Sequence, residues 1–386
     1  MAPAVNIYND PRILAALEEA RSRGENGLAV AAYYRGKLVV DSFAGEADPE
    51  TGRMVDANTI FPVFSVTKGI TALALHMQVD RGLVDLQAPV CKYWPAFAAN
   101  GKDKIIVEHV LMHRSGIPQM PDGVTPELMA DWDWMVKHIE NFTPVFPPGE
   151  VNAYHVLVWG WIAGEIVRRT DPKGRSFQGF VYEEICKPLG VTEFYLGVPD
   201  SELPRVAKLS GGNKAPYVDN FNISPSVVFP GSTVHNQRVV QQCVDPGAGA
   251  ITTASAVARI FAMLAGFGEL EGVRLLSAER IRSFTEPREG VRDPDKVVMI
   301  PTWFGRAGYF IGGEPVASTP LLGSNREAIY SPGAGGSYAW ANLRDNVAVA
   351  ICHNNMDMGT VHEPELTFMP IVRAVQAVID EIKAKE

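Results

Sequence analysis

Ser65 and Lys68 are the residues whose types and spacing most directly suggest chemistry. They open an apolar-periodic segment over residues 65–82, which predicts a helix. Positions i and i+3 share one helix face, so the Lys68 amine can lie beside the Ser65 hydroxyl. A serine hydroxyl is a poor nucleophile until a neighbouring group takes its proton. Lysine can take it when apolar surroundings, here Phe61 and Phe64, lower its pKa well below the ordinary ~10.4.

The Ser-x-x-Lys pattern also has a purely structural explanation. Serine is preferred at helix N-caps, and a lysine one turn later is commonly solvated. A helix start at Ser65 equally suits catalysis, because the positive end of the helix dipole stabilises a developing oxyanion. The rest of the sequence has to decide between the two interpretations.

Four segments, in the right order, give the chain a family resemblance. They are FPVFSVTKGITALALHMQVDRGLVDLQAPV (61–90), VEHVLMHRSGIPQ (107–119), FPPGEVNAYHVLVWGWIAGEIV (146–167) and SPGAGGSYAW (331–340). Together they make the chain resemble the serine β-lactamase and penicillin-binding-protein superfamily, in its class C-like branch. That branch includes esterases with a β-lactamase fold, the family VIII carboxylesterases. The resemblance extends over about residues 10–380.

The resemblance implies roles for residues beyond the Ser-x-x-Lys pair. Tyr154 matches the tyrosine of the second motif, which helps to shuttle the proton of the nucleophile. A phenol can do so when nearby cations such as Lys68 lower its pKa from ~10. The resemblance also implies an oxyanion hole made by the backbone N–H groups of Ser65 and of Ala334 or its neighbour.

The sequence departs from the family pattern at two places. The second motif is usually Tyr-x-Asn, but Val156 replaces the Asn, so an amide donor for β-lactam side chains is lost. The third motif usually begins with Lys or His, which would bind a substrate carboxylate, but here Ser331 precedes Pro332 and Gly333. Both changes disfavour β-lactams and peptidoglycan peptides. We therefore expect a carboxylesterase (class EC 3.1.1) that hydrolyses small neutral esters through a Ser65 acyl-enzyme.

Three other functions stay open at this stage. An acyltransferase would use the same acyl-enzyme with an alcohol or amine acceptor. A β-lactamase or peptidase of the same fold is the second alternative, although both motif changes disfavour its substrates. A non-enzymatic binding or scaffold protein of the same fold would not need Ser65, Lys68 and Tyr154 together.

Further motifs do not favour another chemistry. The run Gly335–Ala339 nearly matches a G-x-S-x-G elbow but ends in Ala. His109 and His113 have the spacing of a zinc pair, but the Glu of H-E-x-x-H and a third ligand are missing. No Walker A or Rossmann glycine pattern is present. We expect neither a metal nor a cofactor.

The elements that must position these residues come from both ends of the chain. Residues 10–23 predict a helix and residues 27–47 a hairpin that turns at Arg35-Gly36. At the other end, residues 337–354 predict strand, turn and strand, followed by a closing helix over 368–384. This arrangement predicts an α/β (α+β) fold: one antiparallel sheet flanked by helices and built from both chain ends, with an inserted all-α domain.

The same pattern predicts the domain limits. Residues 1–90 and 245–386 are expected to form the sheet domain, with helices over 252–267 and 277–285. Residues 91–244 are expected to form a mostly helical domain that ends in a long irregular loop, 201–244. A long irregular stretch in a compact protein is usually either a functional loop or a disordered one, and as a functional loop this segment is expected to shape specificity.

Composition sets the broad class. The chain has 386 residues, 46% of them hydrophobic, and a formal net charge of −9. This is ordinary for a globular protein. The negative charge, without any Lys/Arg run, argues against a nucleic-acid partner.

The sequence also predicts where the protein is located. The N-terminus has no secretory signal pattern, and the apolar stretch 156–163 is too short for a bilayer. We expect a cytoplasmic protein with a small-molecule ester as partner and no membrane contact.

The cysteines are far apart and predict free, buried thiols: Cys91, Cys186, Cys243 and Cys352. The sequence leaves the oligomeric state open.

Overall fold

The two ends of the chain form neighbouring strands of one sheet. The computed structural model describes residues 10–213, 221–313, 321–322, 325–357 and 364–386. In it, β1 (Gly27–Tyr34) pairs antiparallel with β12 (Val347–His353). The expected hairpin is present, since Arg35 and Gly36 both have the positive φ of a tight two-residue turn. The prediction of an antiparallel sheet built from both chain ends is confirmed.

Within the described residues this sheet has seven strands, in the order β3-β2-β1-β12-β11-β10-β9. All neighbouring strands are antiparallel. The strands not yet introduced are β2 (Lys37–Asp48), β3 (Arg53–Met54), β9 (Phe310–Ile311), β10 (Ala328–Pro332) and β11 (Tyr338–Asn342).

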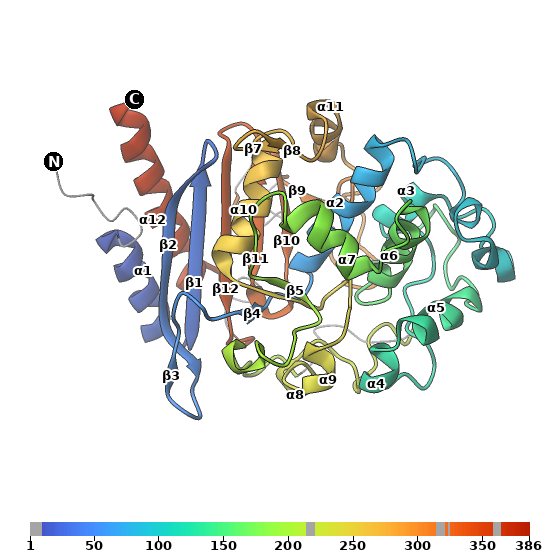
Figure 1. The fold of residues 1–386 in the computed structure, drawn as a ribbon, viewed down its shortest axis with the longest axis horizontal. Coiled ribbons are helices and arrows are strands. Elements are labelled where there is room, and N and C mark those ends of the chain that lie inside the picture. The colour runs from blue at the N-terminus through green and yellow to red at the C-terminus, as the bar shows by residue number, and fades with distance from the viewer. Residues whose placement is uncertain (1–9, 214–220, 314–320, 323–324, 358–363) are drawn as a thin grey trace.

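Helices cover both faces of the sheet. The terminal helices α1 (Pro11–Ser22) and α12 (Pro364–Lys385) lie on one face, and α10 (Ala254–Ala265) lies on the other (Figure 1). Side chains alternate between the two faces along a strand. Because both faces of β12 are covered, all its residues are buried, and they are apolar up to Cys352. Its larger side chains face the terminal helices and its small ones face α10, which allows α10 to pack closely.

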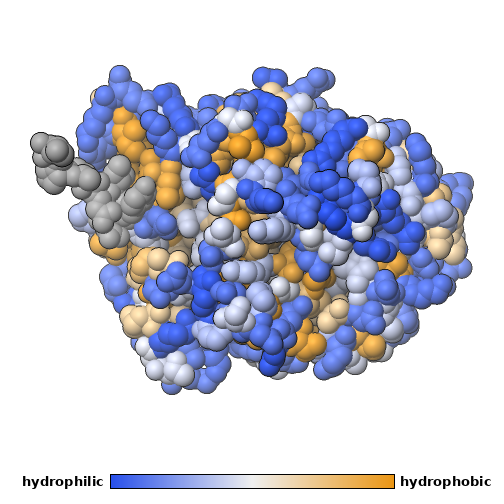
Figure 2. Space-filling model, viewed as in Figure 1, coloured by the Kyte–Doolittle hydropathy of each residue, from blue (hydrophilic) through white to orange (hydrophobic). Residues whose placement is uncertain are grey.

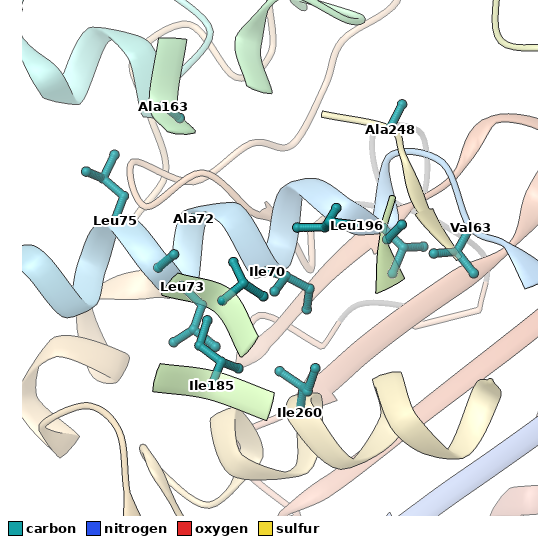
Figure 3. Packing of buried hydrophobic residues seen from close by; sticks show 14 of the residues in the cluster. Val63, Ile70, Ala72, Leu73, Leu75, Ala163, Ile185, Leu196, Ala248 and Ile260 are labelled. Atoms are coloured by element: carbon teal, nitrogen blue, oxygen red, sulfur yellow. The ribbon is translucent and has the colours of Figure 1, made fainter. Parts of the chain in front are cut away.

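Helix α2 (Val66–Asp80) runs through the middle of the molecule. Its residues are buried from Val66 to Gln78, polar ones such as Lys68 included, so every side of the helix packs against other parts of the protein. Figure 3 shows Ile70 and Leu73 of α2 in the cluster that also holds Ile185 and Ile260. Any polar group near the start of α2 is therefore held in a dry and rigid environment.

The remaining helices and strands connect and flank these layers. The helices are α3 (Val107–Leu111), α4 (Pro126–Met129), α5 (Trp132–Glu140), α6 (Trp159–Thr170), α7 (Phe177–Val181), α8 (Ser232–His235), α9 (Arg238–Gln241) and α11 (Ala278–Arg282). The short strands are β4 (Phe61–Pro62), β5 (Phe194–Leu196), β6 (Ala250–Thr252), β7 (Glu269–Leu270) and β8 (Val273–Arg274).

A second sheet, in the order β4-β6-β5, was not foreseen. Its strand β5 lies inside the segment expected to be mostly helical. Residues 60–64, which contain β4, are strand-like in sequence, but strands of two or three residues are too short to show a period of two, so β5 and β6 give no signal. The sheet matters because β4 leads directly into the start of α2. The segment 201–244, expected to be irregular, contains the short helices α8 and α9, while its residues 214–220 lie outside the described residues.

The surface is mainly hydrophilic on the face drawn in Figure 2, with small hydrophobic patches between polar residues. Among the described helices, none combines the length and apolar character that crossing a membrane requires. All four cysteines are free, and Cys91 is only half-buried, whereas the other three are buried as expected.

Candidate active site

A sharp turn between β4 and α2 sets the position of Ser65. Phe64 has a φ of 48°, a left-handed conformation that is strained for a bulky residue. The hydroxyl of Thr67 donates to the Phe64 carbonyl and supports this turn. The helix can therefore start immediately after a buried strand, with Ser65 at its N-terminal end.

The Lys68 amine lies among three oxygens. Its Nζ is 2.9 Å from Ser65 Oγ, 2.7 Å from the Val156 carbonyl oxygen and 2.9 Å from the Gly247 carbonyl oxygen. An uncharged amine has two N–H donors and one lone pair. In the uncharged form the two carbonyls accept the two N–H bonds and the lone pair is left for the proton of Ser65, whereas an ammonium would donate to all three oxygens. This arrangement is what a base for Ser65 requires.

Burial favours this uncharged form. Lys68 is only 3% exposed. The loss of solvent lowers the pKa of its amine far below the ordinary value, and the buried carboxylate of Asp245 partly opposes that shift. The sequence analysis expected burial to lower this pKa, and burial is its main cause in the structure.

Tyr154 lies beside the pair. Its ring centroid is 5.3 Å from Lys68 Nζ. One face of the ring stacks on His113 at 4.4 Å between centroids. Its backbone N–H donates to the buried carboxylate of Asp295 at 3.0 Å. The structure therefore brings Ser65, Lys68 and Tyr154 together, as the sequence predicted.

The third motif also reaches the nucleophile. Ser331 Oγ donates to the Ser65 backbone carbonyl at 2.7 Å, so its hydroxyl holds the helix start. A Cβ on Gly333 would lie 2.4 Å from the Val63 carbonyl oxygen, which explains why glycine follows Pro332. Among the described residues, the N–H groups of Ser65 and Ala334 have no protein acceptor.

The position at which Val156 replaces the family asparagine keeps a contact with the lysine. Its backbone carbonyl, rather than a side-chain amide, accepts from Lys68. The neighbouring His155 is fully buried, with Nε2 2.7 Å from Ser115 Oγ. Burial lowers the pKa of His155 to about 3, so it is a neutral structural residue.

Sequence reasoning missed three residues of the site. Asp245 and Asp295 are buried carboxylates that anchor loops, and Arg288 is a buried cation near Asp295 at 3.4 Å. Single charged residues in loops carry no periodic signal, so only the fold reveals that they are buried. Asp245 does precede Pro246 and Gly247, and Asp before such a pair is a turn signal that could have marked it.

The two histidines considered for zinc have separate surroundings. His113 packs against Tyr154, whereas His109 packs against Gly149. Within the described ranges, no group of three His, Cys, Asp or Glu side chains is placed to hold a metal ion.

Comparison with known proteins connects this geometry to a family. The family model described as Beta-lactamase matches residues 14–369. The chain is 31% identical over 378 residues to "Esterase/beta-lactamase LipL" of Mycobacterium tuberculosis. The aligned region covers 90% of this chain and 82% of that protein.

Solved structures agree over nearly the whole chain. A family VIII carboxylesterase superposes with a TM-score of 0.85 at 27% identity, covering 98% of this chain and 99% of the other. A penicillin-binding protein homologue from Caulobacter crescentus superposes with a TM-score of 0.83 at 30% identity, covering 96% of this chain and 98% of the other. The antiparallel sheet with its flanking helices is the architecture of these serine β-lactamase-like proteins.

Proposed function

The chain belongs to the beta-lactamase family, and from that premise we propose that it is a serine ester hydrolase that cleaves small neutral esters. The observation that carries the proposal is the Lys68 amine, placed between two carbonyl oxygens with its third contact at Ser65 Oγ. The similarity to an esterase/β-lactamase and to a carboxylesterase supports the same class of reaction.

Acylation follows from the positions of these groups. Lys68 takes the proton of Ser65 as Oγ bonds to the ester carbonyl carbon. The negative charge that develops on the carbonyl oxygen is received by the backbone N–H groups of Ser65 and Ala334. The C–O bond to the alcohol then breaks, and Tyr154 passes the proton from Lys68 to the leaving alkoxide. The products are a free alcohol and an acyl ester on Ser65.

Deacylation reverses the proton movements. Water replaces the alcohol in the site and gives a proton to the Lys68–Tyr154 pair as its oxygen attacks the acyl carbon. The bond to Ser65 Oγ breaks, Oγ recovers a proton, and the carboxylic acid leaves. No further co-reactant is required.

The preference for neutral esters rests on the third motif. A cation at position 331 would attract a substrate carboxylate. Ser331 is uncharged, and its hydroxyl is already used by the Ser65 carbonyl. Carboxylate-bearing β-lactams and peptides therefore find no charge partner at this position, whereas neutral esters need none.

The experiment is intact-mass spectrometry after brief mixing with a panel of p-nitrophenyl esters. We expect a mass increase equal to the acyl group on the wild-type protein and none on Ser65→Ala. A wild-type protein that never gains the acyl mass, or a Ser65→Ala variant that gains it equally, contradicts the proposal.

Two added reagents separate the other activities. Faster turnover of a chromogenic cephalosporin than of the esters would identify a β-lactamase instead. With an added alcohol, transfer product that outgrows free acid would identify an acyltransferase. Under our proposal, the esters turn over faster than the cephalosporin. With an added alcohol, free acid forms in greater amount than transfer product.

A further inference from the structure

The buried carboxylate of Asp245 has no part in the reaction as described above. We propose that Asp245 is a positioning residue that sets the strength of the Lys68 base, by holding the Gly247 carbonyl against the amine and by supplying the negative charge that balances the ammonium. This inference rests on the proposed function, because it assumes that Lys68 takes the proton of Ser65.

The first support is the turn that Asp245 closes. Its Oδ1 accepts the backbone N–H of Gly247 at 2.7 Å and that of Ala248 at 3.1 Å. The carbonyl of the same Gly247 accepts from Lys68 Nζ at 2.9 Å. The Ala248 N–H belongs to the same peptide group as the Gly247 carbonyl, so the carboxylate fixes the peptide group that carries the orienting oxygen and the one before it.

The second support is that this turn is clamped to the two helices of the site. Thr71 of α2 donates its hydroxyl to the Pro246 carbonyl at 2.6 Å. A Cβ on Gly160 of α6 would lie only 2.1 Å from the Gly247 nitrogen, so the backbones are in direct contact. The turn cannot shift away from Lys68 without moving α2 or α6.

The third support is electrostatic. Asp245 is 2% exposed and Lys68 is 3% exposed, so solvent hardly screens their attraction. Burial raises the pKa of Asp245, and its two N–H bonds and Lys68 oppose this. Burial lowers the pKa of Lys68, and Asp245 opposes this. Each group thus favours the charged form of the other.

The other groups around the pair do not replace this charge. His113 and His155 are buried, and burial lowers the pKa of both, so they face Lys68 as neutral rings. The pKa of the buried Cys243 thiol is raised by burial and by Asp245, so it stays protonated. Tyr154 presents its ring to the amine. Asp245 is the carboxylate whose charge acts on Lys68.

The consequence concerns the moment at which Ser65 loses its proton. Lys68 then becomes an ammonium in a dry site, and the Asp245 carboxylate stabilises that charge. Without the carboxylate, Lys68 is uncharged down to lower pH but is also a weaker base. Removal of the Asp245 charge should therefore have two effects on kcat/KM plotted against pH. The acid limb should move to lower pH, and the plateau should fall.

The test compares kcat/KM for a p-nitrophenyl ester against pH in the wild type and in Asp245→Asn. Asparagine keeps an oxygen that can accept the Gly247 N–H but has no charge. We expect the acid limb to move to lower pH by about one unit and the plateau to fall about ten-fold. An unmoved acid limb, whatever the plateau does, overturns the inference.

The matched control is Thr71→Val, which removes the hydroxyl that holds the Pro246 carbonyl and changes no charge. It should lower the plateau without moving the limb; a limb shift like that of Asp245→Asn would show that the shift reports loop position rather than charge. If Asp245→Asn does not fold, Asp245→Ser replaces it under the same criteria. Absence of an acyl adduct on the wild type would refute the proposed function itself, whereas an active wild type with an unmoved variant limb refutes only the role of Asp245.

Discussion

At the scale of single residues, the site depends on where the polar atoms of Lys68 and Tyr154 find partners. Lys68 has three oxygen neighbours, which match two donors and one lone pair. The Tyr154 ring stacks on His113, and its centroid is 5.3 Å from the amine nitrogen. The Ser-x-x-Lys spacing and the family resemblance were enough to select Ser65, Lys68 and Tyr154. They did not select Asp245: the Asp-Pro-Gly run marks a turn there, but the burial of its carboxylate results from contacts between distant segments.

The role of the Tyr154 hydroxyl can be tested separately from its ring. Tyr154→Phe keeps the stacking on His113 and removes only the proton carrier. We expect kcat for ester hydrolysis to fall about 10²–10⁴-fold, with an unchanged thermal unfolding midpoint. Tyr195→Phe, which removes a hydroxyl from β5, is the control and should keep wild-type activity. Tyr154→Phe activity within two-fold of wild type would remove the phenol from the mechanism.

At the scale of elements, the active site is assembled by close backbone contacts rather than by one motif. The turn after Asp245, the start of α6 and the N-terminal end of α2 meet around Lys68. The sequence predicted α2 and the hairpins well, since their periodicity extends over many residues. It could not predict the sheet β4-β6-β5, whose strands are held by pairing with distant partners.

The contact between α6 and the Asp245 turn gives a prediction at this scale. In Gly160→Ala the added Cβ would overlap the Gly247 backbone, so one element has to move. We expect a loss of about 1–3 kcal/mol in the free energy of unfolding and a lower kcat/KM, because Gly247 also orients Lys68. Urea unfolding and ester hydrolysis measure the two effects.

The control for that prediction is Gly179→Ala in α7. There, the nearest atom to a new Cβ is the hydroxyl oxygen of Ser176, at 3.1 Å, rather than a backbone in contact with the site. Activity should be unchanged in this variant. Wild-type stability and activity in Gly160→Ala would show that the contact is not tight in solution.

At the scale of the whole molecule, buried histidines couple the stability of the fold to pH. Burial lowers the pKa of four of them: to about 4 for His76 and His235, to about 3 for His155, and well below the ordinary value for His113. The folded protein keeps these rings neutral, whereas the unfolded chain protonates them below pH ~6.5. Composition shows how many histidines there are, but only the fold shows which are buried.

This difference predicts acid instability. Below pH ~6.5 the unfolded chain binds more protons, so each buried histidine lowers the free energy of unfolding by about 1 kcal/mol per pH unit. Asp245 acts in the opposite direction, because its raised pKa makes the folded state take up a proton first. The net expectation is a loss of about 3–6 kcal/mol between pH 6.5 and pH 5.

Urea unfolding at several pH values measures this loss. His76 lies away from the catalytic residues, with Nε2 bonded to the Ala307 carbonyl. His76→Gln should therefore reduce the pH dependence of the free energy of unfolding by the contribution of one bound proton. A free energy of unfolding that is constant from pH 7 to pH 5 would contradict the assignment of neutral buried histidines.

The central claim is that an uncharged lysine amine removes the proton of Ser65. The most direct measurement is the rate of Ser65 acylation by a p-nitrophenyl ester, followed against pH in a single turnover. The claim predicts a rate that rises along one limb whose midpoint lies well below the ~10.4 of free lysine, and loss of that limb in Lys68→Ala. A midpoint near that of free lysine, or a Lys68→Ala variant that acylates at the wild-type rate, would contradict it.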